Sequence, residues 1–320
     1  MKNLKFIDLC AGIGGFRYAL DKSAECILTC EIDQFASQTY KANFKDNNWS
    51  SDVKKIESKN IENFDILCAG FPCQAFSLAG KQAGFLDIRG TIFFDIVRIA
   101  KEKKPSVLFL ENVKNLRSHE KGNTFKIIQK NLDDLNYWHK DYLINAQYFV
   151  PQKRQRIYII ALRKDLFTEA DFNTLCLDIE TKYHQKQQQP LPRFQDILEK
   201  VVSDKYILSD KLWSFLQAHA SKHNAKGNGF GFGLMKDGDI TSRTLTARYY
   251  KDGSEVLIEQ KNKNPRKLTP REAARLMGYP EEYKIVVSDT QAYKQFGNSV
   301  VVPVIQMLAE SILKCINKKN

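Results

Sequence analysis

The chain has 320 residues, 43% of them hydrophobic, and its formal net charge is +12. This length supports one large core with a second, smaller lobe, and the hydrophobic content argues against a disordered chain. The charge favours a polyanionic partner such as nucleic acid. Because no apolar run approaches the roughly 18 residues that span a bilayer, we expect no membrane partner.

Residues 1–165 alternate short apolar runs with amphipathic stretches. We expect strands at 4–9, 26–31, 64–69, 106–111, 140–146 and 156–162, and helices at 15–22, 34–43, 91–103 and 122–135. This alternation predicts a doubly wound α/β domain built on a mainly parallel sheet.

Beyond this domain the chain changes character. A polar tract at 181–193 is typical of a linker or domain boundary. The region after it is glycine-rich and basic, with β-like runs at 242–250 and 254–259. The last stretch, 293–316, ends in a helical apolar pattern.

The first expected strand leads into a glycine-containing turn, Cys10-Ala11-Gly12-Ile13-Gly14-Gly15, which opens a helix. Glycines let the backbone approach a ligand closely, and a helix amino terminus offers free N–H groups. Glu31 ends the second expected strand, where a carboxylate can accept hydrogen bonds from both hydroxyls of a ribose. These features predict a nucleoside cofactor, with Asp52 a candidate for its base. The alternative is a glycine turn that only packs a strand against a helix.

The cysteines are Cys10, Cys26, Cys30, Cys68, Cys73, Cys176 and Cys315. An odd number without a signal-peptide layout argues for free thiols in a reducing, cytoplasmic compartment. Cys26 and Cys30 lack a second pair or a nearby histidine, so we expect no metal site.

Cys73 differs from the other cysteines because it lies just past the expected strand at 64–69, after Gly70-Phe71-Pro72. Ligands of open α/β sheets bind at the carboxyl ends of the strands, which makes Cys73 a candidate nucleophile. A nucleophilic thiol needs a lowered pKa and partial exposure. The alternative is a small buried apolar residue.

Two further segments carry candidate catalytic groups. Glu111 ends the strand at 106–111, where desolvation can raise the pKa of a carboxyl and suit it to donate a proton. Arg154 and Arg156 precede the next strand, and alternation would point both guanidinium groups to one side, toward a phosphate or carboxylate. Taken alone, a carboxylate such as Glu111 more often forms a salt bridge or helix cap, and a lone pair of arginines at a strand start is usually a solvated edge.

Together these segments resemble the bacterial DNA cytosine-5 methyltransferases over nearly the whole chain. The segments that carry the resemblance are 6–17, 70–77, 111–113, 152–156, 271–280 and 295–300. The resemblance implies S-adenosylmethionine as cofactor, double-stranded DNA as partner, and a Rossmann-like sheet with a smaller, mainly β or irregular target-recognition domain. It implies a catalytic and cofactor-binding domain at 1–178, a target-recognition domain at 179–285, and a carboxyl-terminal segment, 286–320, that returns to the first domain.

The resemblance also implies roles for individual residues. The Cys73 thiolate would attack carbon 6 of a flipped cytosine while Glu111 hydrogen-bonds or protonates ring N3, and Arg154 and Arg156 would hold the base, Glu111 and nearby phosphates. The implied cofactor-binding residues are Cys10, Ile13, Gly14, Gly15, Glu31, Ile32, Asp52, Val53, Gly70, Pro72, Ile92, Asn298 and Ser299. Two of these depart from the family pattern, which usually has phenylalanine at the position of Cys10 and often tryptophan at that of Ile32.

The segments 227–234 and 241–255 resemble the Dcm-type branch, which methylates the inner cytosine of sites that begin CC and end GG. We therefore expect a CCNGG-like or CCWGG-like site, with CCGG next. The implied DNA-binding residues are Gln74, Ser77, Arg243, Thr244, Arg248 and Tyr249. Arg243 and Arg248 are candidates for guanine contacts in the major groove, and phosphate contacts are an equal alternative for each.

Three other functions compete with this hypothesis. A tRNA cytosine-5 methyltransferase would use the same scaffold, and an idle DNA-binding protein would not need Cys73, Glu111 and the arginines. A nicotinamide dehydrogenase would have no role for the thiol loop. We expect a bacterial, nucleoid-associated enzyme that acts on DNA as a monomer. Its cognate restriction endonuclease would be a functional rather than a physical partner.

Overall fold

The computed structural model describes residues 4–45, 48–72, 92–225, 227 and 231–319. The chain forms two compact units. The sheet unit comprises Met1–Ile144, Gln155–Lys186 and Val302–Asn320, and the second unit comprises Asn145–Arg154 and Gln187–Val301. The domain boundaries expected after residues 178 and 285 therefore differ from the unit boundaries. The segment Asn145–Arg154 falls in the second unit because it pairs with residues near Ser242.

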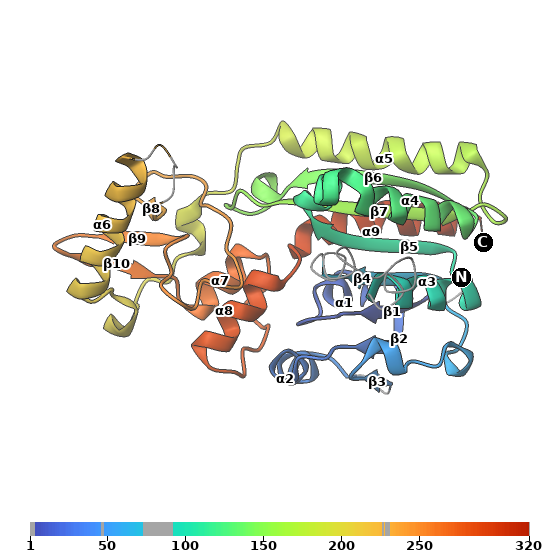
Figure 1. Ribbon diagram of the computed structural model, residues 1–320, viewed down its shortest axis with the longest axis horizontal. Helices are drawn as coiled ribbons and strands as arrows, with labels where there is room; N and C mark the ends of the chain where they lie inside the picture. The colour runs from blue at the N-terminus through green and yellow to red at the C-terminus, as the bar shows by residue number, and fades with distance from the viewer. Residues whose placement is uncertain (1–3, 46–47, 73–91, 226, 228–230, 320) are drawn as a thin grey trace. The chain divides into compact units, whose positions relative to one another are not determined.

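Within the described residues, the sheet unit has a seven-stranded sheet in the order β3-β2-β1-β4-β5-β7-β6 (Figure 1). The strands are β1 (Lys5–Leu9), β2 (Glu25–Cys30), β3 (Trp49–Ser50), β4 (Ile66–Gly70), β5 (Val107–Val113), β6 (Tyr137–Asn145) and β7 (Gln155–Arg163). β1 pairs in parallel with β2 and β4, β2 with β3, and β4 with β5, whereas β7 runs antiparallel to β5. The expected α/β class with a mainly parallel, Rossmann-like sheet is confirmed.

Helices cover both faces of this sheet. They are α1 (Gly15–Leu20), α2 (Gln34–Asn43), α3 (Ile92–Lys103), α4 (Asn123–Asp134), α5 (Glu169–Gln187) and α9 (Val302–Asn317). Ile96 of α3 and Ile128 of α4 share a buried cluster with Leu67 of β4 on one face. On the other face, Phe16 of α1 meets Phe109 of β5 edge-on, with ring centroids 5.0 Å apart. Figure 1 shows α4 in front of the strands and α9 behind them.

The carboxyl-terminal helix α9 packs against α1, so the end of the chain belongs to the sheet unit. The stretch Asp289–Asn317 is long and apolar enough to cross a membrane by length and composition. However, 72% of its most apolar window is buried inside the protein, as is usual for a core helix.

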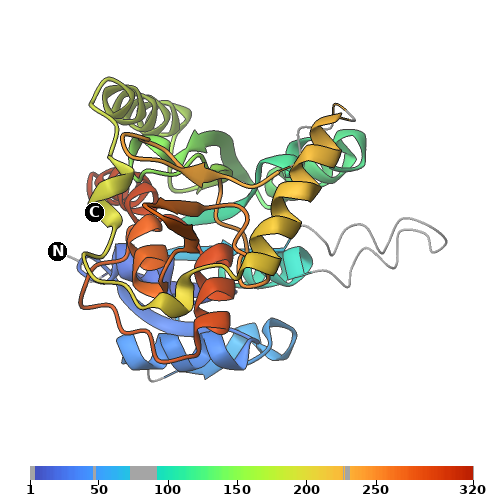
Figure 2. The same ribbon diagram turned by 90° about the vertical axis from the view of Figure 1, so that its left-hand side faces the viewer.

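In the part of the chain that the structure describes, the second unit has a three-stranded sheet in the order β10-β9-β8 (Figure 1), which is also drawn in Figure 2. Its elements are α6 (Asp210–Ala225), β8 (Leu234–Met235), β9 (Leu257–Gln260), β10 (Lys263–Lys267), α7 (Pro270–Leu276) and α8 (Asp289–Asn298). Helix α7 begins at Pro270 because Thr269 and Glu272 form a capping box. Glu272 also forms a buried ion pair with Arg266 at 2.7 Å, which ties α7 to β10.

Three expectations about local structure were wrong in part. Helix α5 extends to Gln187 and so occupies the start of the tract 181–193, although the expected boundary does fall inside that tract, between Lys186 and Gln187. Helix α6 lies in a region for which only β-like and glycine-rich character was expected. The run 242–250 forms a single bridge and turns rather than a strand, because the backbone of Ser242 pairs with Pro151 and Lys153 instead of a neighbouring strand.

Candidate active site

The carboxyl ends of four strands bring the candidate residues of the sheet unit together. Leu9 of β1 lies opposite Cys30 of β2 and Ala69 of β4, and Gly70 lies opposite Glu111 of β5. The segments that follow these strand ends therefore share one edge of the sheet. This is the edge at which open α/β sheets bind ligands.

The glycine turn after β1 is shaped by three residues with positive φ: Cys10 (55°), Gly12 (57°) and Gly14 (80°). The Gly12 N–H donates to Oε2 of Glu31 at 2.7 Å, and the Asp33 N–H donates to Oε1 at the same distance. Glu31 therefore fixes the turn against the end of β2. A Cβ added to Gly14 would lie 2.4 Å from the Phe44 ring, so only glycine fits there.

The turn leaves room for a ligand. A Cβ built on Gly12 would meet nothing within 4 Å, which shows open space beside the backbone. Beyond Glu31, the side chain of Ile32 is 75% exposed, unusual for a large apolar residue. Together they fit a cofactor that lies along the turn and covers Ile32. These observations agree with the expected nucleoside site.

The other expected cofactor residues of the sheet unit take different positions. Ile13, Gly15 and Val53 are buried beneath the surface. One carboxylate oxygen of Asp52 accepts from the Lys54 N–H at 3.0 Å and so caps the 3-10 turn Val53–Lys55. Ile92 begins α3, half-buried against the core, and Pro72 is exposed. Asp52 thus has a structural role whether or not it also contacts a ligand.

The thiol at position 10 is protonated. Burial, and then the charge of Glu31, raise the pKa of Cys10 well above its usual range. Burial also raises the pKa of Cys30, which lies opposite Leu9, to about 12. Cys10 is therefore neutral at physiological pH and acts as a small, weakly polar group in the turn.

Glu111 and Arg156 form the candidate catalytic pair. Nε of Arg156 lies 3.3 Å from Oε1 of Glu111, and the two side chains are 17% and 12% exposed. The antiparallel register of β5 and β7 brings them together. Arg156 lies opposite Val113, two residues from Glu111, so Glu111 and Arg156 are diagonal neighbours on one face of the sheet. A Cβ on Gly70 would be 3.5 Å from Oε2 of Glu111, so the carboxylate lies over the end of β4.

The nucleophile candidate Cys73 lies outside the described residues, as do Gln74 and Ser77. The segment that leads to them is anchored. The buried Asn112 side chain donates to the carbonyl oxygen of Phe71 at 2.7 Å, while its own oxygen accepts from the Val113 N–H. The chain therefore leaves β4 next to Glu111 in a fixed direction.

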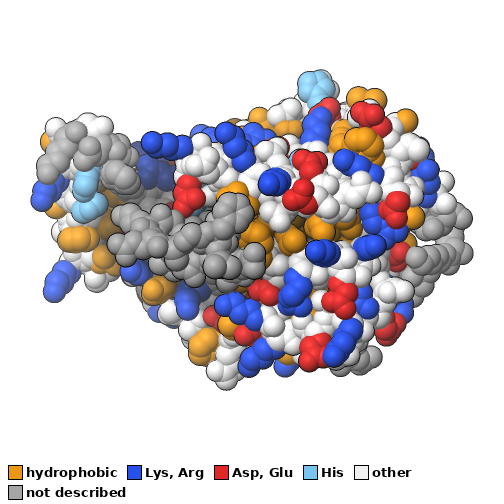
Figure 3. All heavy atoms as spheres, turned by 45° about the vertical axis from the view of Figure 1, so that its right-hand side comes forward, with side chains coloured by type: hydrophobic (Ala, Val, Ile, Leu, Met, Phe, Trp, Pro, Cys, Tyr) orange, Lys and Arg blue, Asp and Glu red, His pale blue; other side chains and the backbone are white. Residues whose placement is uncertain are grey.

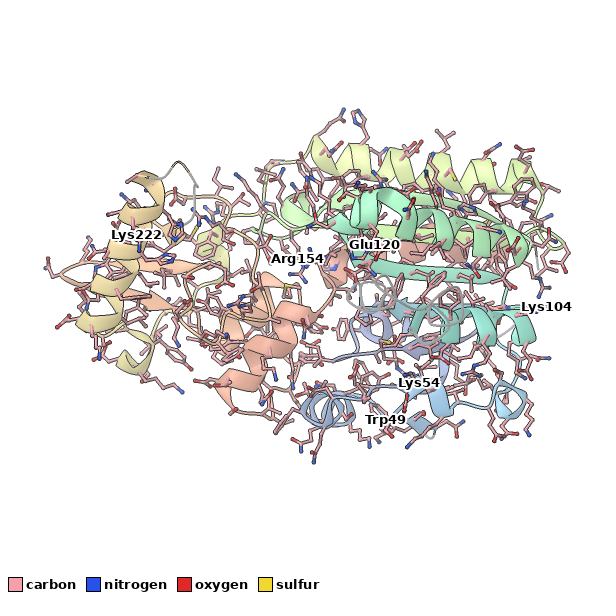
Figure 4. All side chains as sticks on the ribbon, in the orientation of Figure 1. Trp49, Lys54, Lys104, Glu120, Arg154 and Lys222 are labelled. Carbon is pink, nitrogen blue, oxygen red and sulfur yellow. The ribbon has the colours of Figure 1, made fainter. Side chains whose placement is uncertain are left out.

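Arg154 does not take the position expected for it. It is 1% exposed, and its guanidinium donates to the carbonyl oxygens of Leu245, Gly297 and Ser299 within the second unit (labelled in Figure 4). A guanidinium occupied by three backbone carbonyls is not free to hold a base or a phosphate. The expectation that both guanidinium groups point to one side is corrected: Arg156 pairs with the Glu111 carboxylate, and Arg154 is internal.

The residues expected to contact DNA differ in their exposure to solvent. Arg243 and Arg248 are exposed, although Nη1 of Arg243 donates to the Gly231 carbonyl at 2.6 Å. Thr244 is half-buried, with its hydroxyl bonded to the Lys153 carbonyl. Tyr249 was a wrong choice, because it is fully buried and its hydroxyl donates to the Val256 carbonyl at 2.7 Å.

Charge does not mark a binding surface on the face drawn in Figure 3, where lysine and arginine side chains are interspersed with aspartate and glutamate. Two of the expected cofactor residues, Asn298 and Ser299, lie at the end of α8 in the second unit, and Asn298 is exposed. Ser299, half-buried, shares a hydrogen bond of 2.7 Å with the Tyr279 hydroxyl. No group of three or more candidate metal ligands occurs among the described residues.

Comparison with known proteins decides the family. The C-5 cytosine-specific DNA methylase family matches residues 4–314. The chain belongs to this family. The type II methyltransferase M1.ScrFI of Lactococcus lactis subsp. cremoris is 51% identical over 320 residues, which cover 99% of this chain and 79% of that protein. The DNA-cytosine methyltransferase of Escherichia coli (strain K12) is 40% identical over 369 residues, covering 96% and 76%.

A solved structure shares the fold. The Dnmt2 methyltransferase of S. pombe matches with a TM-score of 0.78 at 20% identity, covering 98% of this chain and all of that one (100%). As a member of the C-5 cytosine-specific DNA methylases, the chain is a DNA cytosine-5 methyltransferase. The pair of Glu111 and Arg156 is thus located in a methylase fold, at the edge where its chemistry is expected.

Three residues of this methylase were not predicted to matter, and each has a clear structural role. Asn112 anchors Phe71, Gln152 is fully buried and bonds to Leu245 and Leu276, and Gly297 approaches a neighbouring backbone closely. All three lie inside recognised motifs. Their positions were therefore visible in the sequence, but their partners lie far away along the chain.

Proposed function

We propose that the chain transfers a methyl group from S-adenosylmethionine to carbon 5 of a flipped cytosine in a short double-stranded site. The observation that supports this proposal most directly is the ion pair between Glu111 and Arg156. Nε of Arg156 lies 3.3 Å from Oε1 of Glu111, and the carboxylate lies over the end of β4, the strand that precedes Cys73. The family match and the type II methyltransferases among the relatives support this reaction. They also support a cytoplasmic role in restriction-modification, alongside a cognate endonuclease.

Carbon 5 of cytosine is too weak a nucleophile to be methylated directly. The Cys73 thiolate adds to carbon 6, while Glu111 hydrogen-bonds or protonates ring N3 and so takes up the developing charge. Arg156 holds the Glu111 carboxylate in position from β7. Once carbon 5 carries the methyl group, loss of its proton releases Cys73. A stacked base is out of reach, so the base is flipped at a cost of a few kcal/mol.

The cofactor, when bound, supplies the electrophilic methyl group. The turn around Gly12 and Gly14 would approach it through backbone atoms, Glu31 would accept hydrogen bonds from its ribose, and Ile32 would cover its base. Asp52, Asn298 and Ser299 stay candidates for further contacts. Ile32 is a smaller surface than tryptophan, so we expect weaker stacking on the base than in relatives with the aromatic residue.

The recognition site is proposed as CCNGG-like or CCWGG-like with the inner cytosine methylated, on the resemblance of 227–234 and 241–255 to the Dcm-type branch. Bisulfite sequencing of DNA from cells that express the chain tests both reaction and site. Protected cytosines in one short sequence context are expected. Protection in no context would contradict the function, and protection in another context would contradict only the site. Labelled methyl transfer to tRNA instead of duplex DNA would favour the alternative substrate.

A further inference from the structure

The second unit contains two buried polar side chains, those of Gln152 and Arg154, on either side of the exposed Lys153. Gln152 is 0% exposed and Arg154 is 1% exposed. Nη1 of Arg154 donates to the Leu245 carbonyl at 2.7 Å, and Nη2 donates to the carbonyls of Gly297 and Ser299 at 3.0 and 2.8 Å. One guanidinium therefore joins two backbone segments that are some fifty residues apart in sequence.

The first of these segments, 242–247, also forms hydrogen bonds with residues 151–153. The Ser242 N–H donates to Pro151 and the Ser242 carbonyl accepts from Lys153, both at 2.9 Å. The side-chain oxygen of Gln152 accepts from the Leu245 N–H at 2.8 Å. Its amide nitrogen donates to the Leu276 carbonyl at the end of α7, at 3.1 Å. Backbone groups of 242–247 are thus paired with residues 151–154.

The second segment, around Gly297, packs against the backbone of 242–247. A Cβ added to Gly297 would lie 2.3 Å from the carbonyl carbon and oxygen of Thr246 and 2.4 Å from the Ala247 nitrogen. No side chain fits there without moving one of the two backbones. Gly297 therefore packs directly against the segment that Arg154 holds by hydrogen bonds.

The hydrogen bonds from residues 151–154 and the close contact of Gly297 hold the backbone that carries residues proposed to face DNA. Thr244 lies within the segment 242–247, and Arg248 directly follows it. Base readout needs side chains placed to within a fraction of an ångström, because a bidentate contact depends on direction as well as distance. A backbone held by charge-assisted hydrogen bonds meets that need.

Arginine suits this task better than lysine does. Its planar fork presents donors in several fixed directions and stays charged, whereas an ammonium is a compact point charge on a flexible stem. Burying a charge is tolerated only where hydrogen bonds compensate it, so the arrangement is sensitive to any change in its partners. Such buried networks are used in proteins to specify one conformation.

We infer that Arg154 is a positioning residue for DNA recognition: it sets the conformation of 242–247 and so the discrimination between sites, without touching the substrate. The inference rests on the proposed function, in which the flanking side chains face DNA. It separates two arginines of one motif, because Arg156 contacts the Glu111 carboxylate, whereas the Arg154 guanidinium donates to three backbone carbonyls.

The test compares Arg154→Lys with Arg156→Lys in the full chain. Steady-state methyl transfer is measured on a duplex with the site found by bisulfite sequencing, and on duplexes with one base pair changed. Arg154→Lys is expected to lower the ratio of kcat/KM between the two duplexes about tenfold, mainly through KM, since one mismatch costs about that much or more. Arg156→Lys is expected to lower kcat and to leave the ratio unchanged.

Leu216→Ala is the matched control, because Leu216 is buried in the same unit in a cluster with Leu208 and Leu257 that does not include residues 151–154, 242–247 or Gly297. A purely structural role for Arg154 would give the result of this control, a lower Tm with an unchanged ratio, and would overturn the inference.

Gly297→Ala disturbs the same segment without altering a charge, and should lower the ratio even if Arg154→Lys fails to fold. An unchanged ratio in Gly297→Ala would also overturn the inference. Methyl transfer by the wild-type chain to no duplex at all would overturn the proposed function itself, which separates the two failures.

Discussion

The side-chain amide of Asn112 donates a hydrogen bond to the backbone carbonyl of Phe71 at 2.7 Å, across the junction of β5 and β4. Phe71 is two residues before the proposed nucleophile, and Asn112 directly follows the proposed acid. The bond therefore links the two halves of the proposed chemistry through a buried contact.

Asn112→Ala should slow methyl transfer more than it weakens cofactor binding, because the segment that carries Cys73 loses its anchor. The unpaired Phe71 carbonyl should also lower the free energy of unfolding by about 1–3 kcal/mol. Single-turnover rates and denaturant unfolding measure the two effects. Unfolding at wild-type stability with unchanged rates would show that the bond is not needed.

Cys73→Ala should abolish methylation while S-adenosylmethionine binding persists, because only the covalent step requires the thiol. A fluorinated cytosine in the recognised site should trap the wild-type chain covalently and fail to trap the variant. Calorimetry with the cofactor supplies the control. Full activity of Cys73→Ala would refute the assigned nucleophile.

Glu111→Gln keeps the size of the side chain and removes its charge and its proton. Chemistry should slow by at least about a hundredfold, the usual contribution of general acid–base catalysis, with a small change in cofactor affinity. Arg156→Lys should slow it less, because lysine keeps the charge that holds Glu111. Equal losses of rate and cofactor affinity would instead place Glu111 in the cofactor site.

The two glycines of the first turn should respond differently to alanine. Both have positive φ, so each substitution strains the backbone by about 1–2 kcal/mol. Gly14→Ala adds a clash with Phe44 and should lower Tm further, whereas Gly12→Ala extends a methyl group into open space. Gly12→Ala should therefore reduce cofactor affinity with the smaller loss of Tm. Wild-type cofactor affinity in Gly12→Ala would count against the site.

Asp178 should make folding sensitive to acid. Burial alone would raise the pKa of Asp178, but hydrogen bonds from Lys314 and Ser311 and the charge of Lys182 outweigh it and lower the pKa to about 2. A lowered pKa contributes stability above the unfolded value of 3.8 and loses it as pH falls toward 2.

Asp178→Asn should therefore cost about 2 kcal/mol at neutral pH and only a small fraction of that at pH 2. Glu180→Gln, on the same helix, is the control: its pair with Lys140 is half exposed and should contribute little. Unfolding curves of both variants between pH 2 and pH 7 provide the measurement. A pH-independent cost for Asp178→Asn would contradict the assigned pKa.

The strands and helices of the sheet unit could be predicted because their signals are local. The apolar run around Ile66 and Leu67 marks a buried strand whatever surrounds it, and the glycines after Leu9 mark a turn. Glu111 and Arg156 could be proposed as partners because the order of their motifs resembles a known family. Helix α6 was missed since its stabilisation comes from packing around Leu216 rather than from a clear apolar stripe.

The sequence by itself determined the family and the α/β class and predicted roles for Cys73, Glu111 and Arg156, since these depend on residue types in a fixed order. Only the tertiary structure decided that Arg154 and Tyr249 are internal and that Gly297 packs against Thr246. The physical reason is the separation in sequence between the residues that interact. Neighbours in the chain determine strands and turns, whereas the partners of the buried Arg154 guanidinium lie 91 to 145 residues away along the chain and are brought to it only by folding.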